Sequence, residues 1–356
     1  MTAELYKIFR NSLKNIHLYI GLVFGPIVLT LGITGAILAF EKEIDYKLNS
    51  SLWTVSPQET RVSLQSILES IQTKFHSQRF LRVEIQSNIV RPIVFSTSDD
   101  FQVFADPYSG AILGSRKYLN TFFGVNREIH RSLFLEGIGK QIVSVTSLVV
   151  IGLILSGLFL WWPRKKQSFR NKFSLKMPAS WKGINFKVHS LLGFMASFYL
   201  FILAFTGVAS GFNFAEKGIF GFSDSVLPAW KNHPFSRGTS TSRQTTLDEA
   251  FNTASKIIPN ADWTDIILPQ THNSSFEINR AVTTLFSQQS ENFIYIDKFD
   301  GAILRIDYAI DRPFSAELPI ILTPLHEGTI WGLSTRVYAF LCSVALMFLV
   351  LGGIFL

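Results

Sequence analysis

The chain has 356 residues, of which 47% are hydrophobic and 17% are charged, and its formal net charge is +7. Soluble chains usually carry about 25% charged residues, so this composition indicates a membrane protein. The one cysteine, Cys342, excludes a disulfide within the chain, an iron–sulfur cluster held by several thiolates and thioether attachment of haem.

Four long apolar runs predict membrane-spanning helices. Each is long enough to cross a hydrocarbon core, which takes about 20 residues, and none contains Asp, Glu, Lys or Arg. The runs are Ile16–Phe40, Ile142–Trp162, Leu191–Phe214 and Val337–Leu356. The first run is too long for the apolar region of a signal peptide, and no Ala-x-Ala site follows it, so we expect an uncleaved helix.

The distribution of charge predicts how these helices are oriented. Residues 163–187, between the second and third runs, include eight Lys or Arg and no Asp or Glu. The N-terminal stretch adds Lys7, Arg10 and Lys14, whereas the long segments after the first and third runs are near neutral or acidic. Basic loops face the cytoplasm, so the N-terminus is expected inside and both long segments outside. This pattern favours a topology signal over nucleic-acid binding.

The two halves of the chain repeat one another. An offset of 172 carries His17 to His189 and Gly21 to Gly193, and an offset of 196 carries His130 to His326. The external segments match at "DPYSGAIL" and "DKFDGAIL". Each half therefore reads as helix, external segment, helix, and the two halves run in the same direction.

Both external segments are expected to be small α+β units. Residues 63–75 and 246–258 have the apolar spacing of helices, with Ser63 and Thr246 as N-caps and Glu249 completing a capping box. Alternating segments predict strands at 91–97, 102–106, 274–280 and 292–297, and each half ends in a hairpin with a further strand at 111–114 or 302–306. Asp106 and Asp297 are expected to bond turn amides rather than a metal.

Several of these motifs are similar to those of a known protein family. The chain resembles the PepSY-associated transmembrane family through the H-x-x-x-G motifs at His17 and His189, the D-x-x-[S/D]-G-x-x-L hairpins, the histidines before the second and fourth runs, and "LSGLFLWWPRKK". Better-understood members are inner-membrane ferric-siderophore reductases with b-type haems. The implied fold is membrane α-helical, with four transmembrane helices in two tandem repeats and two extracytoplasmic α+β PepSY-like domains.

The expected organisation follows from the runs and the repeat. The segments, in order, are 1–40 with the first helix, 41–129 as the first external domain, 130–162 with the outer histidine and second helix, 163–188 as a basic cytoplasmic loop, 189–214 as the third helix, 215–325 as the second external domain, and 326–356 with the outer histidine and fourth helix.

Four histidines are the candidate ligands. Helices one and three run outward, so His17 and His189 share one level, and His130 and His326 share the other. A 20-residue helix spans about 30 Å, so the pairs form separate sites. Two imidazoles suit a six-coordinate haem iron, whereas zinc takes three or four protein ligands. Outside, Glu128 and Glu327 lie near the histidines in sequence, which leaves a metal site open there.

Small residues accompany the inner histidines. Gly21 and Gly193 follow His17 and His189 by four residues, so they lie on the same helix face. A flat macrocycle needs the volume that their missing side chains leave, although small residues also mediate helix packing in membranes. The duplicated arrangement favours a cofactor.

The expected function is therefore electron transfer by two haem b groups, with the four histidines as axial ligands. The resemblance implies an oxidoreductase of the bacterial inner membrane, with periplasmic external domains and a ferric siderophore as acceptor. No nucleotide-binding motif is present, so the donor is expected to be a separate protein, a soluble reductant or a membrane quinol. Two alternatives remain open: a membrane-anchored PepSY interaction or regulatory module without redox activity, and a siderophore transporter.

Overall fold

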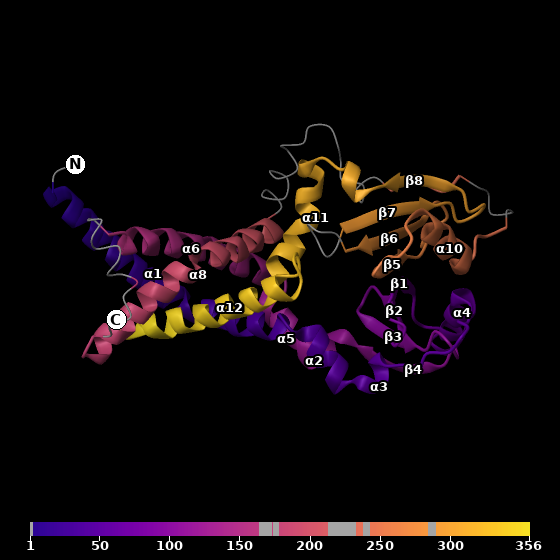
Figure 1. The fold of residues 1–356 in the computed structure, drawn as a ribbon, viewed down its shortest axis with the longest axis horizontal. Helices are drawn as coiled ribbons and strands as arrows, with labels where there is room; N and C mark the ends of the chain where they lie inside the picture. Colours follow the sequence, from indigo (N-terminus) through magenta and orange to yellow (C-terminus); the bar gives the residue numbers. More distant parts are fainter. Residues whose placement is uncertain (1–2, 164–172, 174–177, 213–232, 238–242, 284–289) are drawn as a thin grey trace. The chain divides into compact units, whose positions relative to one another are not determined.

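The structure is a computed structural model that describes residues 3–163, 173, 178–212, 233–237, 243–283 and 290–356 (Figure 1). The chain forms two compact units, each assembled from segments far apart in the sequence. The helical unit contains Met1–Phe40, Asn126–Ile219 and Ile321–Leu356, and the sheet unit contains Glu41–Val125 and Phe220–Ile320.

Within the described part of the chain, four helices are long and apolar enough to cross a membrane. They are α1 (Ala3–Leu38), α6 (Gly139–Trp161), α8 (Trp181–Gly211) and α12 (Leu333–Ile354). Each packs against two others in the cyclic order α1, α6, α8, α12, so α1 and α8 occupy opposite corners of a bundle, as do α6 and α12. Large apolar side chains such as Val23 (71% exposed) and Phe198 (73%) face outward, as a lipid environment allows.

All four helices begin earlier than the apolar runs predict, and α1 and α8 differ from the prediction the most. Helix α1 begins at Ala3 rather than Ile16, and α8 begins at Trp181 rather than Leu191, after Ser180 accepts a hydrogen bond from the Gly183 amide. The basic residues before each run continue the helix, because Lys and Arg are good helix formers. His17 and His189 are consequently inside helices. Half of the predicted basic loop at 163–188 lies outside the described residues, and its part from Trp181 onward belongs to helix α8.

The sheet unit is one antiparallel sheet of eight described strands. The strands are β1 (Phe80–Gln86), β2 (Ile93–Thr97), β3 (Phe101–Ala105), β4 (Ile112–Lys117), β5 (Trp263–Ile267), β6 (Phe276–Val282), β7 (Ser290–Ile296) and β8 (Ile303–Asp307). Their order is β4-β3-β2-β1-β5-β6-β7-β8. Each half of the chain thus contributes four neighbouring strands, and the halves meet where β1 pairs with β5.

This shared sheet differs from the expectation of two separate external domains. The seam strands β1 and β5 are the two strands that the sequence prediction lacks. Alone, each half would end in an edge strand with unpaired backbone groups, and pairing β1 with β5 satisfies one edge of each half. An ion pair from Arg82 on β1 to Asp265 on β5, with 2.6 Å between Nη2 and Oδ2, also crosses the seam.

Short helices complete the unit and lead into the membrane helices. They are α2 (Glu41–Leu48), α3 (Ser50–Trp53), α4 (Leu64–Lys74), α5 (Phe122–Ser132), α10 (Leu247–Ile257), α11 (Phe314–Glu327) and the 3-10 turns η1 (Tyr118–Asn120) and η3 (Ala309–Asp311). The predicted turns are confirmed: Asp106 and Asp297 accept turn amides, and Gly110 and Gly301 have φ of +71° and +73°.

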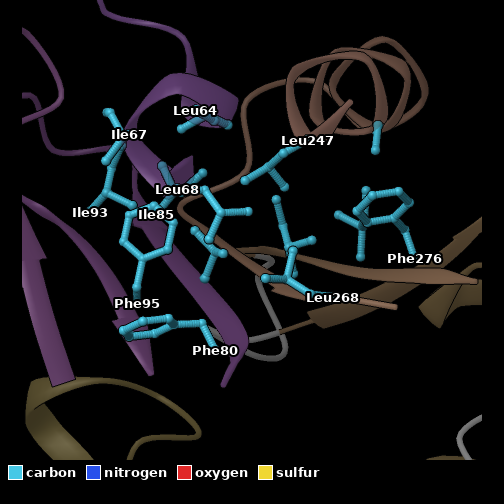
Figure 2. Close-up of a cluster of buried hydrophobic side chains, with 14 of the residues drawn as sticks. Leu64, Ile67, Leu68, Phe80, Ile85, Ile93, Phe95, Leu247, Leu268 and Phe276 are labelled. Atoms are coloured by element: carbon cyan, nitrogen blue, oxygen red, sulfur yellow. The ribbon is translucent and has the colours of Figure 1, made fainter. Parts of the chain in front are cut away.

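The main core lies between the sheet and helices α4 and α10. Ile67 and Ile71 of α4, and Leu247 of α10, are at most 1% exposed and pack with β-strand residues from both halves (Figure 2). Phe95 and Ile278, one from each half, are completely buried in the same cluster. The core is therefore a single one that neither half encloses alone.

Helices α4 and α10 cap one another across the two halves. The carboxylate of Asp248 on α10 accepts the amides of Leu64 and Gln65 at 2.8 and 2.9 Å, and the Gln65 side chain accepts the Leu247 amide at 3.1 Å. These bonds supplement the predicted caps, which are confirmed: Ser63 accepts from Ser66, and Thr246 with Glu249 forms a capping box.

Replacing Asp248 with alanine is expected to destabilise the sheet unit by about 1–2 kcal/mol, since the first amides of α4 lose their acceptor. Hydrogen-exchange protection of α4 and α10 in the full chain measures this loss. Asp248→Asn, which retains one acceptor oxygen, should lose less. Equal protection in the parent chain and Asp248→Ala would contradict the assigned role.

Glu277 on β6 makes the stability of the sheet unit depend on pH. Its carboxylate lies 2.9 Å from Nδ1 of His233, with a side chain only 14% exposed. Burial, followed by the charge of Asp265, raises the pKa of Glu277 from 4.5 to about 7. A raised carboxyl pKa means that the folded state binds the proton more tightly, so the unit loses stability as the pH rises from about 4.5 through about 7.

Glu277→Gln should therefore melt at a higher temperature than the parent chain at pH 8, with the difference shrinking at pH 5. Thermal unfolding at both pH values measures this difference in melting temperature. Glu59 is exposed, so Glu59→Gln is the control and should change the melting temperature at neither pH. A difference between parent and variant that is independent of pH would contradict the assignment.

Candidate functional site

The outer histidines come together in the helical unit. His130 lies on α5, just before α6, and His326 lies on α11, just before α12. Their ring centroids are 6.0 Å apart with an interplanar angle of 61°. Because α6 and α12 occupy opposite corners of the bundle, these two side chains meet across its interior.

Each outer histidine bonds a threonine at matching positions of the repeat. His130 Nδ1 lies 2.8 Å from Thr34 Oγ1 on α1, and His326 Nδ1 lies 2.7 Å from Thr206 Oγ1 on α8. Thr34 and Thr206 are 5% and 1% exposed. The offset of 172 that relates the inner histidines also relates these threonines, so the same contact occurs in both halves of the chain.

The inner histidines lie on the other pair of opposite helices. His17 is on α1 and His189 is on α8, and their side chains are within electrostatic range of each other. His17 Nδ1 lies 2.8 Å from Ser156 Oγ near the end of α6. His189 Nδ1 is buried and has no hydroxyl partner within the described part of the chain; the Leu349 backbone carbonyl is its nearest acceptor, in a contact too poorly aligned for a regular hydrogen bond.

The two pairs lie at opposite ends of the bundle. His17 contacts the C-terminal part of α6, whereas His130 contacts Thr34 near the C-terminus of α1. His17 and Thr34 are 17 positions apart on α1, which at 1.5 Å per residue separates the two levels by about 25 Å. The prediction of two distinct histidine levels thus agrees with the geometry.

The predicted glycines differ in their surroundings. A Cβ added at Gly21 would meet no described atom within 4 Å, and one at Gly193 would meet Leu349 Cδ2 at 3.5 Å, an ordinary contact. Tight helix packing does not explain Gly21, which leaves open space on the face that carries His17. This observation fits the interpretation of a cofactor cradle.

Other glycines, which the sequence analysis did not assign to the site, contact the imidazoles directly. An added Cβ would lie 3.3 Å from His17 Cε1 at Gly157, 3.6 Å from His189 Cε1 at Gly353 and 3.2 Å from His130 Cε1 at Gly35. Gly157 and Gly353 match at the offset of 196, so the repeat contained the signal. Their missing side chains let the rings approach the neighbouring helices closely.

A conventional metal cluster is absent from the described residues. No group of three or more His, Cys, Asp or Glu side chains there could hold a metal ion. Glu128 does not join His130 in such a cluster, and its carboxylate accepts a hydrogen bond from Ser132 on its own helix. The site within the bundle therefore consists of imidazole pairs without supporting carboxylates.

The fold and this geometry define a multi-pass membrane protein with two histidines at each end of a four-helix bundle, of which the outer two lie with ring centroids 6.0 Å apart. Residues 14–356 match the family described as the PepSY-associated TM region, and the chain belongs to that family. Comparison with curated proteins gives no match.

Proposed function

We propose that this protein is a haem-dependent oxidoreductase that passes electrons across the bacterial inner membrane to a ferric siderophore. His17 and His189 would hold one haem b, and His130 and His326 would hold a second. The observation that carries the proposal is that two histidines lie at each end of the helical bundle, where the described residues form no cluster of three or more His, Cys, Asp or Glu side chains.

The outer pair has the separation that haem ligation requires. Metal–imidazole bonds of about 2 Å on each side, plus about 1 Å from each nitrogen to its ring centroid, put two trans imidazole centroids about 6 Å apart. The rings of His130 and His326 are 6.0 Å apart. Two protein ligands suffice for haem, because the porphyrin fills the equatorial positions, whereas zinc would need more donors than either pair offers.

Haem would supply a one-electron couple between ferric and ferrous iron. With two histidines holding each haem, the group would be suited to outer-sphere electron transfer rather than to oxygen chemistry. The bundle places the pairs about 25 Å apart along α1, one toward each membrane face. The positive-inside pattern assigns the His17 and His189 end to the cytoplasm.

Family resemblance and coordination chemistry support a ferric siderophore as the acceptor. Hard oxygen donors of hydroxamate type hold Fe(III) far better than Fe(II), so one electron loosens the metal. That electron would come from a separate protein, a soluble reductant or a quinol. Reduction thus releases Fe(II) on the side of the sheet-forming segments, which would be periplasmic.

Absorption spectra of purified protein, oxidised and dithionite-reduced, with a pyridine haemochrome count, test the cofactor. Two b haems per chain would support it, and colourless protein from cells with ample haem would favour the interaction or regulatory module. Anaerobic mixing of reduced protein with a ferric hydroxamate, with a chromogenic Fe(II) chelator present, tests the acceptor. Reoxidation with Fe(II) release would support reduction, and uptake of the intact complex by vesicles without reductant would favour a transporter.

A further inference from the structure

We propose that Thr34, Thr206 and Ser156 are positioning residues that fix three of the four histidines with a proton on Nδ1, and that the fourth histidine, His189, lacks this support. The inference rests on the proposed haem sites. It assigns roles to hydroxyl side chains that touch no iron, and it makes the two sites unequal.

The group to which each threonine donates its hydroxyl proton determines the direction of its hydrogen bond with histidine. Thr34 Oγ1 donates to the Thr30 carbonyl at 2.7 Å, and Thr206 Oγ1 donates to the Ile202 carbonyl at 2.8 Å. Threonine has one hydroxyl proton, so only its lone pairs remain for the imidazole. His130 and His326 must therefore donate from Nδ1, which leaves Nε2 without a proton and free to ligate.

Ser156 acts in the same way at the other end of the bundle. Its Oγ donates to the Gly152 carbonyl at 2.7 Å and lies 2.8 Å from His17 Nδ1. Bonding of a helix hydroxyl to the carbonyl one turn earlier is ordinary for Ser and Thr. The helix backbone thus orients the hydroxyl, and the hydroxyl orients the imidazole.

His189 is the exception. The offset of 196 that carries Gly157 to Gly353 carries Ser156 to Gly352, where no hydroxyl exists. A Cβ built at Gly352 would lie 3.9 Å from His189 Nδ1, so a serine there would bring its oxygen toward the ring. The inner site therefore has one ligand with a hydroxyl partner and the outer site has two, while His189 has only the Leu349 backbone near its ring.

Hydrogen bonds from the second ring nitrogen raise the basicity of an imidazole ligand, and their removal typically costs about 10- to 100-fold in metal affinity. Loss of haem to excess apomyoglobin should consequently be biphasic for the parent chain, with the His17/His189 haem leaving first. A more basic ligand also favours ferric iron, so removing a hydroxyl should raise the midpoint potential of that haem alone.

The first test replaces Thr34 with valine, which keeps the shape and removes the hydroxyl. Haem loss from the outer site should quicken by about 10- to 100-fold, and the potential of that haem should rise while the other stays unchanged. Thr34→Ser retains the hydroxyl and should restore both values. Serine keeps the hydroxyl but lacks the methyl of threonine. Rescue by serine would therefore show that the hydroxyl, and not the packing of the methyl, supports the site.

The second test adds the missing hydroxyl. Gly352→Ser should slow haem loss from the inner site and lower its potential relative to Gly352→Ala. Alanine is the matched control, because a Cβ at this position meets Asn185 Oδ1 at 2.8 Å in both variants and disturbs equally the hydrogen bond from Asn185 to the Gly352 carbonyl.

The outcomes separate this inference from the function on which it rests. Parent protein without haem would overturn the proposed function itself. Parent protein with two haems, combined with unchanged potentials and haem loss in Thr34→Val, would overturn the positioning role alone. Equal behaviour of Gly352→Ser and Gly352→Ala would overturn the inferred deficit at His189.

Discussion

Replacing His130 with alanine is expected to leave purified protein with one b haem per chain where the parent chain has two. His326→Ala should have the same result, since one imidazole of the pair cannot hold a bis-histidine haem. His17→Ala should remove the other haem, and the double variant His17→Ala with His130→Ala should be colourless. Pyridine haemochrome content, normalised to protein, measures each loss.

The exposed His76 provides a matched control. It lies at the end of α4 in the sheet unit, so His76→Ala should keep both haems. Retention of two haems in His130→Ala would show that the pairing across the bundle is not the ligand set. A loss of both haems with intact helical content would instead indicate that the two sites assemble together.

Asp45→Ala is expected to cause the largest loss of stability in the sheet unit, about 3–5 kcal/mol. Its buried carboxylate on α2 accepts two hydrogen bonds from Arg116 on β4, at 3.0 and 2.8 Å, and further bonds from Trp53 and Asn49. Truncation leaves the Arg116 guanidinium, with a side chain only 13% exposed, without its counter-charge. Hydrogen-exchange protection of β3 and β4 in the full chain reports the loss.

The same carboxylate predicts acid sensitivity. Burial alone would raise the pKa of Asp45, but the hydrogen bonds and charge of Arg116, helped by Asn49 and Trp53, bring it below its usual 3.8. A lowered carboxyl pKa stabilises the fold above pH 3.8, and this contribution is lost as the pH falls through the folded-state pKa. Lys117→Ala, which removes an exposed ion pair on the same strand, should change protection far less.

Local sequence patterns predict much of this fold. Helices α4 and α10, their caps, the Asp-Gly turns and six of the eight strands follow from short-range spacing, because each depends on a few neighbouring residues. The seam strands β1 and β5 do not, since their partners lie in the other half of the chain. The pairing of β1 with β5 decides whether the two halves form separate domains or one sheet. These strands are far apart in the sequence, so no local pattern records their pairing.

The candidate site divides in the same way. The histidines and their two levels are predictable from helix direction and the repeat. The supporting hydroxyls are not, because Thr34 and Ser156 resemble any small polar residue in a membrane helix until the facing histidine is placed. Apolar runs mark the lipid-facing part of a helix and not its ends, so they underestimate the lengths of α1 and α8.

Both units take their essential contacts from across the two halves: each histidine pair draws one member from each, and the sheet is continuous at β1 and β5. A chain of half this length could not enclose the core or form either pair by itself. It would have to associate with a second copy about a two-fold axis, as an obligate homodimer. Within one polypeptide the two halves are free to differ, as Ser156 and Gly352 do at positions related by the offset of 196.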